Sequence, residues 1–310
     1  MQTSPRIVVV GSINMDLVVR CAVLPIPGET ILAYDSAEVP GGKGANQAVA
    51  AARQGARVAM IAKVGDDSFA NRLRLGIEAA GIDSSQVTSI PNCASGIAII
   101  GVEDSGQNHI MVVPNANGKL SPDDIDVAAG FIRAADLLLV QLEVPLPAVL
   151  RAITIARAAG VRTVLNPAPA PALFPDALFD VDLICPNQSE AATILNISIE
   201  SRQDARLAAQ AFVARGSRNA VITMGHDGVV VCSEDECHWI EPFKVDAVDT
   251  TAAGDAFAAA VAIRWCETGS IVESVKYAAA AGAYAASRFG AQPSMPSRSD
   301  IDSILQRDKK

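Results

Sequence analysis

Residues 137–166 read LLLVQLEVPLPAVLRAITIARAAGVRTVLN, and this stretch contains the pattern that decides the fold. Two short runs rich in branched apolar residues, 137–141 and 161–166, flank a segment of helical spacing at 147–159. Short continuous apolar runs are typical of strands buried on both faces. Because parallel strands need a long crossover between them, the stretch predicts a β-α-β unit.

The same alternation continues on both sides of this unit. In 66–80, for example, Phe69, Leu73, Ile77 and Ala80 recur at the spacing of one helix face. The further strands we expect are 7–10, 58–63, 183–185 and 220–223, and the further helices are 45–53, 66–80, 189–195, 204–215 and 253–265. The fold class is therefore α/β, a three-layer sandwich with a mainly parallel central sheet.

Two regions, 17–39 and 94–113, break the alternation because they contain strand runs with no helix between them. The runs are 17–20, 30–33, 96–102 and 109–113. Such runs can pair antiparallel as a small separate sheet. We interpret them as a lid over the carboxyl ends of the main strands, where open α/β folds bind ligands; two ordinary hairpins are the alternative. With no internal repeat or low-complexity linker, 1–310 is expected to form one domain with a lid.

Composition excludes several function classes. Half of the 310 residues are hydrophobic, 19% are charged and the net charge is −9, so the chain is globular and no nucleic acid or anionic membrane is expected as a partner. The apolar stretches 256–263 and 277–286 are shorter than the roughly 18 residues of a membrane span. The first apolar run is too short for a signal peptide. We therefore expect a cytoplasmic protein.

The six cysteines are scattered, and no spacing with the three histidines matches a zinc site. We expect reduced thiols, as in other proteins of the cytosol.

Two polar segments follow the first expected strand. Residues 11–16 read GSINMD, in which Asn14 and Asp16 can hydrogen-bond vicinal hydroxyls; an Asx turn is the structural alternative. Residues 40–47 read PGGKGANQ, in which glycines allow close approach to a ligand and Lys43 adds a cation. The spacing matches neither a Walker A loop nor a dinucleotide fingerprint, and a plain glycine-rich turn is the alternative.

Residues 248–257 read VDTTAAGDAF and lead into an Ala-rich helix. Backbone N–H groups at a helix start attract anions, and Gly254 leaves room there for a phosphoryl group. Beside them Asp255 can take the proton from an attacking hydroxyl; helix capping is its structural alternative. After the strand at 183–185, Asn187 and Glu190 fit a capping box, or organise water around Mg²⁺ and phosphate.

Together these segments resemble the ribokinase family of carbohydrate kinases over essentially the whole chain. The motifs that carry the resemblance are GSINMD (11–16), PGGKGANQ (40–47), QLE (141–143), NPAPA (166–170), Asn187 with Glu190, DTTAAGD (249–255) and GAQPS (290–294). The resemblance implies ATP as phosphoryl donor, D-ribose as acceptor at its 5-hydroxyl, Mg²⁺ and K⁺ as ions, and a homodimer formed through the lid. It implies an oxyanion site at 252–254 with Asp255 as base.

The resemblance also assigns residues to each ligand. For the sugar it implies Asn14, Met15, Asp16, Gly42, Lys43, Gly44, Ala45, Asn46, Glu143 and Asp255. For the nucleotide it implies Asn187, Thr223, Met224, Gly225, His226, Asp227, Gly228, Gly254 and Ala279. For K⁺ it implies Asp249, Thr251, Ala285, Arg288, Gly290 and Ser294, and for Mg²⁺ it implies Glu190 through water.

Two positions depart from the family pattern. The family usually continues after its base as TFNG, whereas this chain has Ala256-Phe257-Ala258-Ala259, and Ala279 stands where close relatives often have His. Three hypotheses remain at this point: a ribose kinase, a related kinase of deoxyribose or a nucleoside, and a non-catalytic sugar sensor of the same fold. The intact Gly254 and Asp255 favour catalysis. The absence of a dinucleotide fingerprint disfavours a dehydrogenase.

Overall fold

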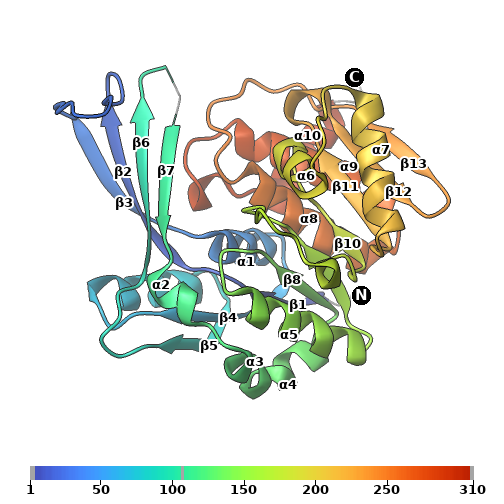
Figure 1. Cartoon of the computed structure of the whole chain (residues 1–310), viewed down its shortest axis with the longest axis horizontal. Helices are drawn as coiled ribbons and strands as arrows, with labels where there is room; N and C mark the ends of the chain where they lie inside the picture. The colour runs from blue at the N-terminus through green and yellow to red at the C-terminus, as the bar shows by residue number, and fades with distance from the viewer. Residues whose placement is uncertain (1–3, 106–107, 308–310) are drawn as a thin grey trace.

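The computed structural model describes residues 4–105 and 108–307 and contains one large and one small sheet (Figure 1). The large sheet has the order β13-β12-β11-β10-β9-β8-β1-β4-β5. All its neighbours pair in parallel except β11/β12 and β12/β13. Its strands are β1 (Arg6–Val10), β4 (Arg57–Val64), β5 (Asp83–Ser89), β8 (Leu137–Val140), β9 (Arg162–Leu165), β10 (Leu183–Ile184), β11 (Asn219–Thr223), β12 (Val229–Ser233) and β13 (Cys237–Ile240).

Helices cover both faces of this sheet, as the alternation in the sequence predicts. One face carries α1 (Lys43–Arg53), α2 (Ser68–Ala79), α8 (Ala253–Thr268), α9 (Ile271–Ala286) and α10 (Arg298–Arg307). The other carries α3 (Pro122–Val127), α4 (Ala129–Ala134), α5 (Leu146–Ala158), α6 (Gln188–Leu195) and α7 (Arg202–Ala214). None of the helices in the described ranges combines the length and apolar character needed to cross a bilayer.

Each central strand contributes side chains to two separate cores. In β1, Ile7 and Val9 pack under α1 and α8, whereas Val8 and Val10 face α4 and α5. Successive side chains of a strand point to opposite faces, so a strand buried on both sides must be apolar at every position. The three-layer α/β fold is thereby confirmed. Strand β5 was not predicted because its sequence, DSSQVTS, is polar.

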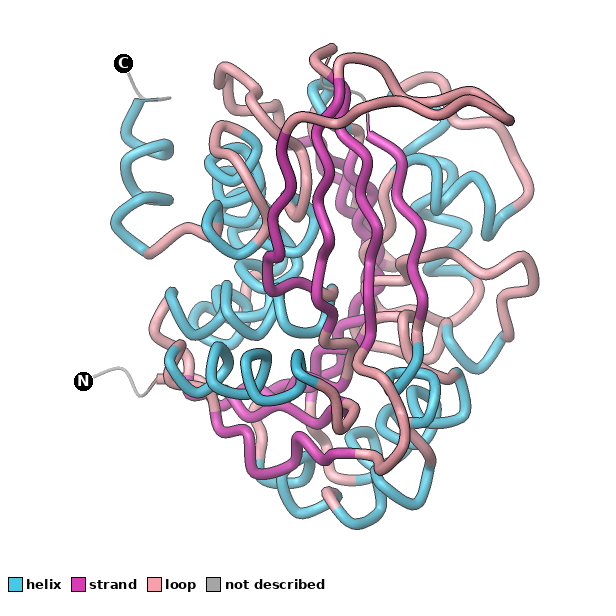
Figure 2. Tube along the Cα trace, turned by 90° about the vertical axis from the view of Figure 1, so that its left-hand side faces the viewer, coloured by secondary structure: helices cyan, strands magenta, loops and turns pink. Residues whose placement is uncertain are grey.

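The small sheet has the order β3-β2-β6-β7 and stands beside the main body (Figure 2). Its strands are β2 (Asn14–Cys21), β3 (Asp35–Gly41), β6 (Gly96–Glu103) and β7 (Asn108–Val113). The expected antiparallel pairing is wrong for the central pair, since β2 and β6 are parallel, with Asn14 opposite Gly96. The reason is that β2 and β6 leave the same edge of the large sheet, after β1 and β5, and therefore run in the same direction.

The expected strand at 30–33 is also wrong, because these residues lie in the connection between β2 and β3. The register of β3 is set at its other end, where Gly41 pairs with Asn14 just before the chain enters α1. The antiparallel pairing of β2 and β3 then continues residue by residue and ends where Arg20 lies opposite Asp35, so β3 begins at Asp35. Pro25, Pro27 and Gly28 precede the ladder, and residues of these types favour irregular connections.

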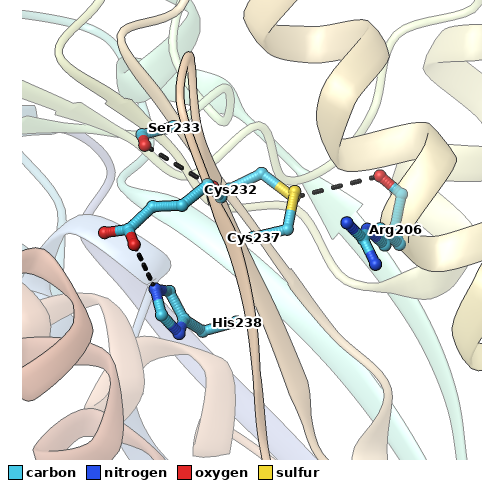
Figure 3. Close-up of a disulfide and its surroundings, with 6 residues drawn as sticks. Arg206, Cys232, Ser233, Cys237 and His238 are labelled. Atoms are coloured by element: carbon cyan, nitrogen blue, oxygen red, sulfur yellow. Dashed lines mark hydrogen bonds and ion pairs between the residues drawn. A yellow bond between two sulfur atoms is a disulfide. The ribbon is translucent and has the colours of Figure 1, made fainter.

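The expectation that all six cysteines are reduced is wrong as well, because Cys232 and Cys237 form a disulfide. Figure 3 shows the bond across the β12–β13 hairpin, with Nε2 of His238 2.9 Å from Oε2 of Glu236 nearby. The two residues are directly opposite in the hairpin register, which brings their side chains together. The other cysteines, Cys21, Cys93, Cys185 and Cys266, are free.

This disulfide predicts a definite thiol count and a stability effect. Protein purified and denatured without reductant is expected to show four reactive thiols, and all six after reduction. Replacing both Cys232 and Cys237 by Ser is expected to lower the free energy of unfolding by about 2 kcal/mol, because the bond closes a short loop in the unfolded chain. Thiol titration and urea denaturation measure the two effects. Six reactive thiols before reduction would contradict the first.

Candidate active site

The candidate residues of the sequence meet at the carboxyl edge of the large sheet. Asn14 and Asp16 follow β1, Glu143 follows β8, Asn187 follows β10, and Asp255 lies in the first turn of α8. This is the edge at which open α/β sheets bind ligands. One pocket there is lined by seven of the predicted sugar and base residues: Asn14, Asp16, Gly42, Lys43, Asn46, Glu143 and Asp255.

The small sheet supplies the other wall of this pocket. Ala98 and Ile100 of β6 and Ile110 and Val112 of β7 line it, together with Asn108. Alternate residues of each strand therefore face the pocket, and Met111 and Val113 point away. Three predicted sugar residues are not in the lining: Met15 and Ala45 are fully buried in the core, and Gly44 packs against the backbone of Ser12.

Asp255 is a buried carboxylate held by neutral amides. Asn46 Nδ2 donates to its Oδ2 at 3.0 Å, and Gln47 Nε2 donates to its Oδ1 at 2.9 Å. Burial raises the pKa of Asp255, whereas the Lys43 ammonium and the two amide donors act in the opposite direction. Hydrogen bonds to the charged form offset part of the desolvation cost and keep the group able to accept a proton.

Two buried oxygens in the pocket are without a donor. Among the described residues, neither Oδ1 of Asp16 nor Oδ1 of Asn46 accepts a hydrogen bond. A buried acceptor without a partner costs free energy, so this pocket favours a ligand that carries several hydroxyl donors. Burial, followed by the charges of Glu143 and Asp255, raises the pKa of Asp16 to about 7.

Glu143 holds the glycine-rich loop in place. Its Oε2 accepts from Ser12 Oγ at 2.5 Å and from the Lys43 N–H at 3.1 Å. Burial alone would lower the pKa of Lys43, but the carboxylates of Asp255, Glu143 and Glu190 raise it overall, so the ammonium stays charged. A Cβ on Gly44 would lie 2.6 Å from the Ser12 nitrogen, which explains the need for glycine there.

Asn117 fixes the other side of the pocket, and the sequence analysis missed it. Its Nδ2 donates to Asn14 Oδ1 at 2.7 Å and to the Ile13 carbonyl at 3.1 Å, and its Oδ1 accepts from the Ile13 N–H. Asn117 lies in the short 3₁₀ helix Asn115–Lys119, far from Asn14 in sequence, so no local signal could have found it.

The turn before α8 has the form of an anion site. Ala252 adopts a left-handed conformation, φ 61°, and a Cβ on Gly254 would meet nothing within 4 Å. The Ala253 N–H donates to the Thr250 carbonyl at 3.2 Å and is therefore already engaged. The N–H of Gly254 lies in the first helical turn, where helix geometry supplies no acceptor.

The residues predicted to bind K⁺ surround this turn. Asp249 joins two loops, since its Oδ1 accepts from the Thr251 N–H and its Oδ2 from the Gly290 N–H, each at 2.9 Å. Ser294 is buried and its hydroxyl donates to the Ala291 carbonyl. The Ala285 carbonyl accepts from the Arg288 N–H at 3.0 Å. In the described part of the chain, no cluster of three or more His, Cys, Asp or Glu side chains could hold a metal ion.

The residues predicted to bind the nucleotide lie further along the carboxyl edge of the large sheet, outside the lining of the pocket that contains Asp255. Thr223 and Asn187 pair in an isolated bridge, and Gly225–Asp227 form a 3₁₀ turn in which the His226 side chain is exposed. The buried Met224 donates its N–H to the Gly228 carbonyl, and Ala279 packs against the core from α9.

The capping box at Asn187 and Glu190 is confirmed. The Asn187 side chain accepts from the Glu190 N–H, and Glu190 accepts from the Asn187 N–H in return. Burial raises the pKa of Glu190, while the Asn187 N–H and the Lys43 charge act against this. The structural role does not exclude the functional one, because Oε1 of Glu190 takes no part in the box.

Comparison with known proteins identifies the class of this chain. The pattern of the pfkB family carbohydrate kinases matches residues 4–298. The chain therefore belongs to the pfkB family of carbohydrate kinases, and its resemblance to the ribokinases in this family is confirmed.

Individual relatives are similar over nearly the whole chain. A ribokinase of Haemophilus influenzae is 38% identical, covering 96% of this chain and 97% of the relative. A deoxyribokinase of Salmonella typhi is 36% identical, covering 96% and 98%. A bifunctional ribokinase/ribose-5-phosphate isomerase A of Fructilactobacillus sanfranciscensis is 39% identical over 98% of this chain, which spans 57% of that relative's length. The solved structure of Arabidopsis thaliana ribokinase complexed with ribose and ATP matches with a TM-score of 0.90 at 30% identity, covering 98% of this chain and 99% of that one.

The raised pKa of Asp16 predicts that this residue lowers stability at neutral pH. A carboxyl with a pKa of about 7 in the folded state and about 4 in the unfolded state takes up a proton on folding between these values, so stability falls as the pH rises from about 4 to 7. Asp16→Asn is expected to raise the free energy of unfolding by a few kcal/mol at about pH 8 and by little near pH 4. Urea denaturation without sugar measures both. Equal effects at the two pH values would contradict the assignment.

Proposed function

We infer that this protein is an ATP-dependent kinase that phosphorylates D-ribose at its 5-hydroxyl, giving ribose 5-phosphate and ADP. One observation carries the inference: the buried Asp255 carboxylate and two unpartnered buried oxygens, of Asp16 and Asn46, share one pocket next to a helix N-terminus. The pocket thus combines a proton acceptor, acceptors for sugar hydroxyls and a place for a transferring phosphoryl group.

In the proposed mechanism, Asp255 takes the proton of the 5-hydroxyl while the sugar oxygen bonds to the γ-phosphorus and the bond to ADP breaks. The Gly254 N–H and the N-terminus of α8 stabilise the charge on the phosphoryl oxygens. The Ala252 and Ala253 backbone completes this oxyanion site once Ala253 releases its contact with Thr250. The Lys43 ammonium adds positive charge on the opposite side.

The sugar is held by polar groups of β2 and α1. Asp16 and Asn46 accept from ring hydroxyls. Asn117 donates to the Asn14 oxygen, which leaves the Asn14 Nδ2 to donate to a sugar oxygen. Glu143 keeps the backbone of Gly42 to Ala45 in register, so Gly44, Ala45 and the neighbouring Met15 act through the backbone and not through their side chains.

We propose that ATP lies along the carboxyl edge over Asn187, Thr223 and the turn from Met224 to Gly228, with Ala279 of α9 beside its base. Glu190 fits a role in holding the water shell of Mg²⁺, since Mg²⁺ keeps several waters and binds through few carboxylates. When bound, Mg²⁺ would neutralise phosphate charge. Glu190 is close enough to Lys43 to influence its pKa, which supports placing the phosphates between them.

We propose a K⁺ site formed by the Asp249 carboxylate and the carbonyls of Thr251, Ala285, Arg288 and Gly290, with Ser294. The donor set fits a hard cation, because each Asp249 oxygen accepts a single N–H and keeps a lone pair. Such an ion would order the loop that precedes α8, so activity should depend on K⁺ at constant ionic strength.

We propose that the whole chain works as one domain and that the small sheet closes over the sugar as a lid. Its outward face exposes Ile99, Met111 and Val113, and β7 is an edge strand with every residue exposed. An apolar edge of this kind favours pairing with a second copy of the chain. Sedimentation equilibrium tests the proposed homodimer.

A cytoplasmic location is proposed from the need for ATP. The Cys232–Cys237 bond stands against a strongly reducing compartment. Thiol trapping in cells therefore tests whether the bond persists in the proposed compartment.

Asp255→Asn is expected to lower turnover by roughly 10²–10⁴-fold, the usual loss for a general base, while ribose binding stays measurable. The variant keeps one acceptor for the two amide donors around it and removes a buried charge, so the fold should persist. Coupled ADP release and calorimetric titration with ribose measure the two properties. Turnover close to that of the unaltered enzyme would show that Asp255 is not the base.

D-ribose is expected to exceed 2-deoxyribose in kcat/KM by roughly 5- to 150-fold. A pocket with buried acceptors penalises a sugar that lacks a hydroxyl, at about 1–3 kcal/mol for each unpaired group. The similarity to a deoxyribokinase makes this comparison the deciding one. Equal kcat/KM values, or a preference for adenosine, would favour a deoxyribose or nucleoside kinase.

A further inference from the structure

A chain of three buried side-chain amides connects Asp255 to the backbone of the central sheet. Gln47 of α1 touches the carboxylate, Gln141 follows β8, and Asn166 follows β9. Gln47 and Gln141 are fully buried and Asn166 is 8% exposed. The lining of the sugar pocket includes none of the three, so none of them is placed to touch the substrate.

The hydrogen bonds allow Gln47 only one orientation. Its Nε2 donates to Asp255 Oδ1 at 2.9 Å and to Asn166 Oδ1 at 3.1 Å, which uses both hydrogens. Its Oε1 accepts from Gln141 Nε2 at 2.5 Å. Turning the Gln47 amide over would place its oxygen against two acceptors and its NH₂ against a donor.

The orientation of the three side-chain amides is set by a backbone carbonyl. Asn166 Nδ2 donates to the Cys185 carbonyl at 3.2 Å, which leaves Asn166 Oδ1 to face Gln47. At the other end, Gln141 fits only because residue 11 is glycine: a Cβ there would lie 2.1 Å from Gln141 Oε1. The arrangement is therefore built by α1 and the ends of β1, β8, β9 and β10.

We propose that Gln47 and Gln141 are positioning residues for phosphoryl transfer: Gln47 holds the Asp255 carboxylate in its reactive orientation, and Gln141 acts by fixing the amide of Gln47. The proposal rests on the role of Asp255 as base. Correct placement of a general base is worth a large part of its effect, since small displacements from the reacting proton reduce the rate strongly.

The charged groups around Asp255 are the same with or without these amides. Lys43 of α1 favours its ionised form, whereas Glu143, Glu190 and Asp16 oppose it from the β8 loop, α6 and β2. Removing the Gln47 donor leaves these charges in place and takes away one hydrogen bond to the ionised carboxylate. The pKa of Asp255 should therefore rise, and the acid limb of the kcat/KM profile should move to higher pH.

The experiment compares Gln47→Met, Gln141→Met and their double mutant with Gln54→Met. Gln54 is a matched control, because it is a fully buried glutamine at the end of the same helix whose amide donates to the Ala50 carbonyl, away from Asp255. For Gln47→Met we expect a roughly tenfold lower kcat, a ribose KM within about twofold, and an acid limb about one pH unit higher. Gln141→Met should change kcat and the acid limb in the same direction by less.

The double mutant shows whether Gln47 and Gln141 act together, as proposed, or have two independent effects on kcat. Because Gln141 acts through Gln47, the double mutant should be no slower than Gln47→Met, whereas independent effects would multiply. Gln54→Met should keep the original pH profile even if it lowers stability. If Gln47→Met does not fold, the pH profile of Gln141→Met decides alone.

Two failures are distinguishable. In the first, Asp255→Asn abolishes turnover, but Gln47→Met and Gln141→Met keep the original kcat and pH profile. The positioning role is then wrong, and the assignment of Asp255 as base is retained. In the second, Asp255→Asn stays active. The assignment of Asp255 as base is then wrong, and so is the positioning role that depends on it. Equal pH shifts in Gln54→Met and Gln47→Met would show a general packing effect and would also overturn the proposal.

Discussion

The burial of the Asp255 carboxylate is the constraint on which the rest of the site depends. A charge removed from water needs partners, and Asp255 receives neutral amides from Asn46 and Gln47 on α1 and the nearby ammonium of Lys43. Since α1 follows the glycine-rich loop and α8 follows the anion turn, this one contact joins the two halves of the chain. It places the proposed base between the proposed sugar side and the proposed phosphate side of the pocket.

The two sheets divide the remaining work. The large sheet is apolar on both faces and gathers the ends of β1, β8, β9 and β10 at one edge, where polar side chains can meet. The small sheet lines the pocket with apolar residues of β6 and β7 and with polar residues of β2, and its other side is exposed. A rigid floor and a separate wall suit a reaction in which water must be kept from the transferring phosphoryl group.

Several features depended on pairings between distant residues. Cys232 and Cys237 looked like unrelated thiols in the sequence, and only the register of the β12–β13 hairpin sets them opposite each other. The parallel pairing of β2 with β6 follows from where β1 and β5 end, and Asn117 reaches Asn14 across more than a hundred residues. Local propensity contains no information about such partners, so none of the three could be predicted.

The sequence by itself determined the α/β class and the two-sided burial of the central strands, and it singled out the residue that we propose as the base. It could do so because apolar periodicity is local and because Gly254 and Asp255 lie together at the start of a helix. The tertiary structure alone decided which amides face Asp255 and which pocket oxygens lack donors. Hydrogen-bond direction depends on the positions of Gln47, Gln141 and Asn166, which lie far apart in the chain and meet only when the sheet and α1 have packed.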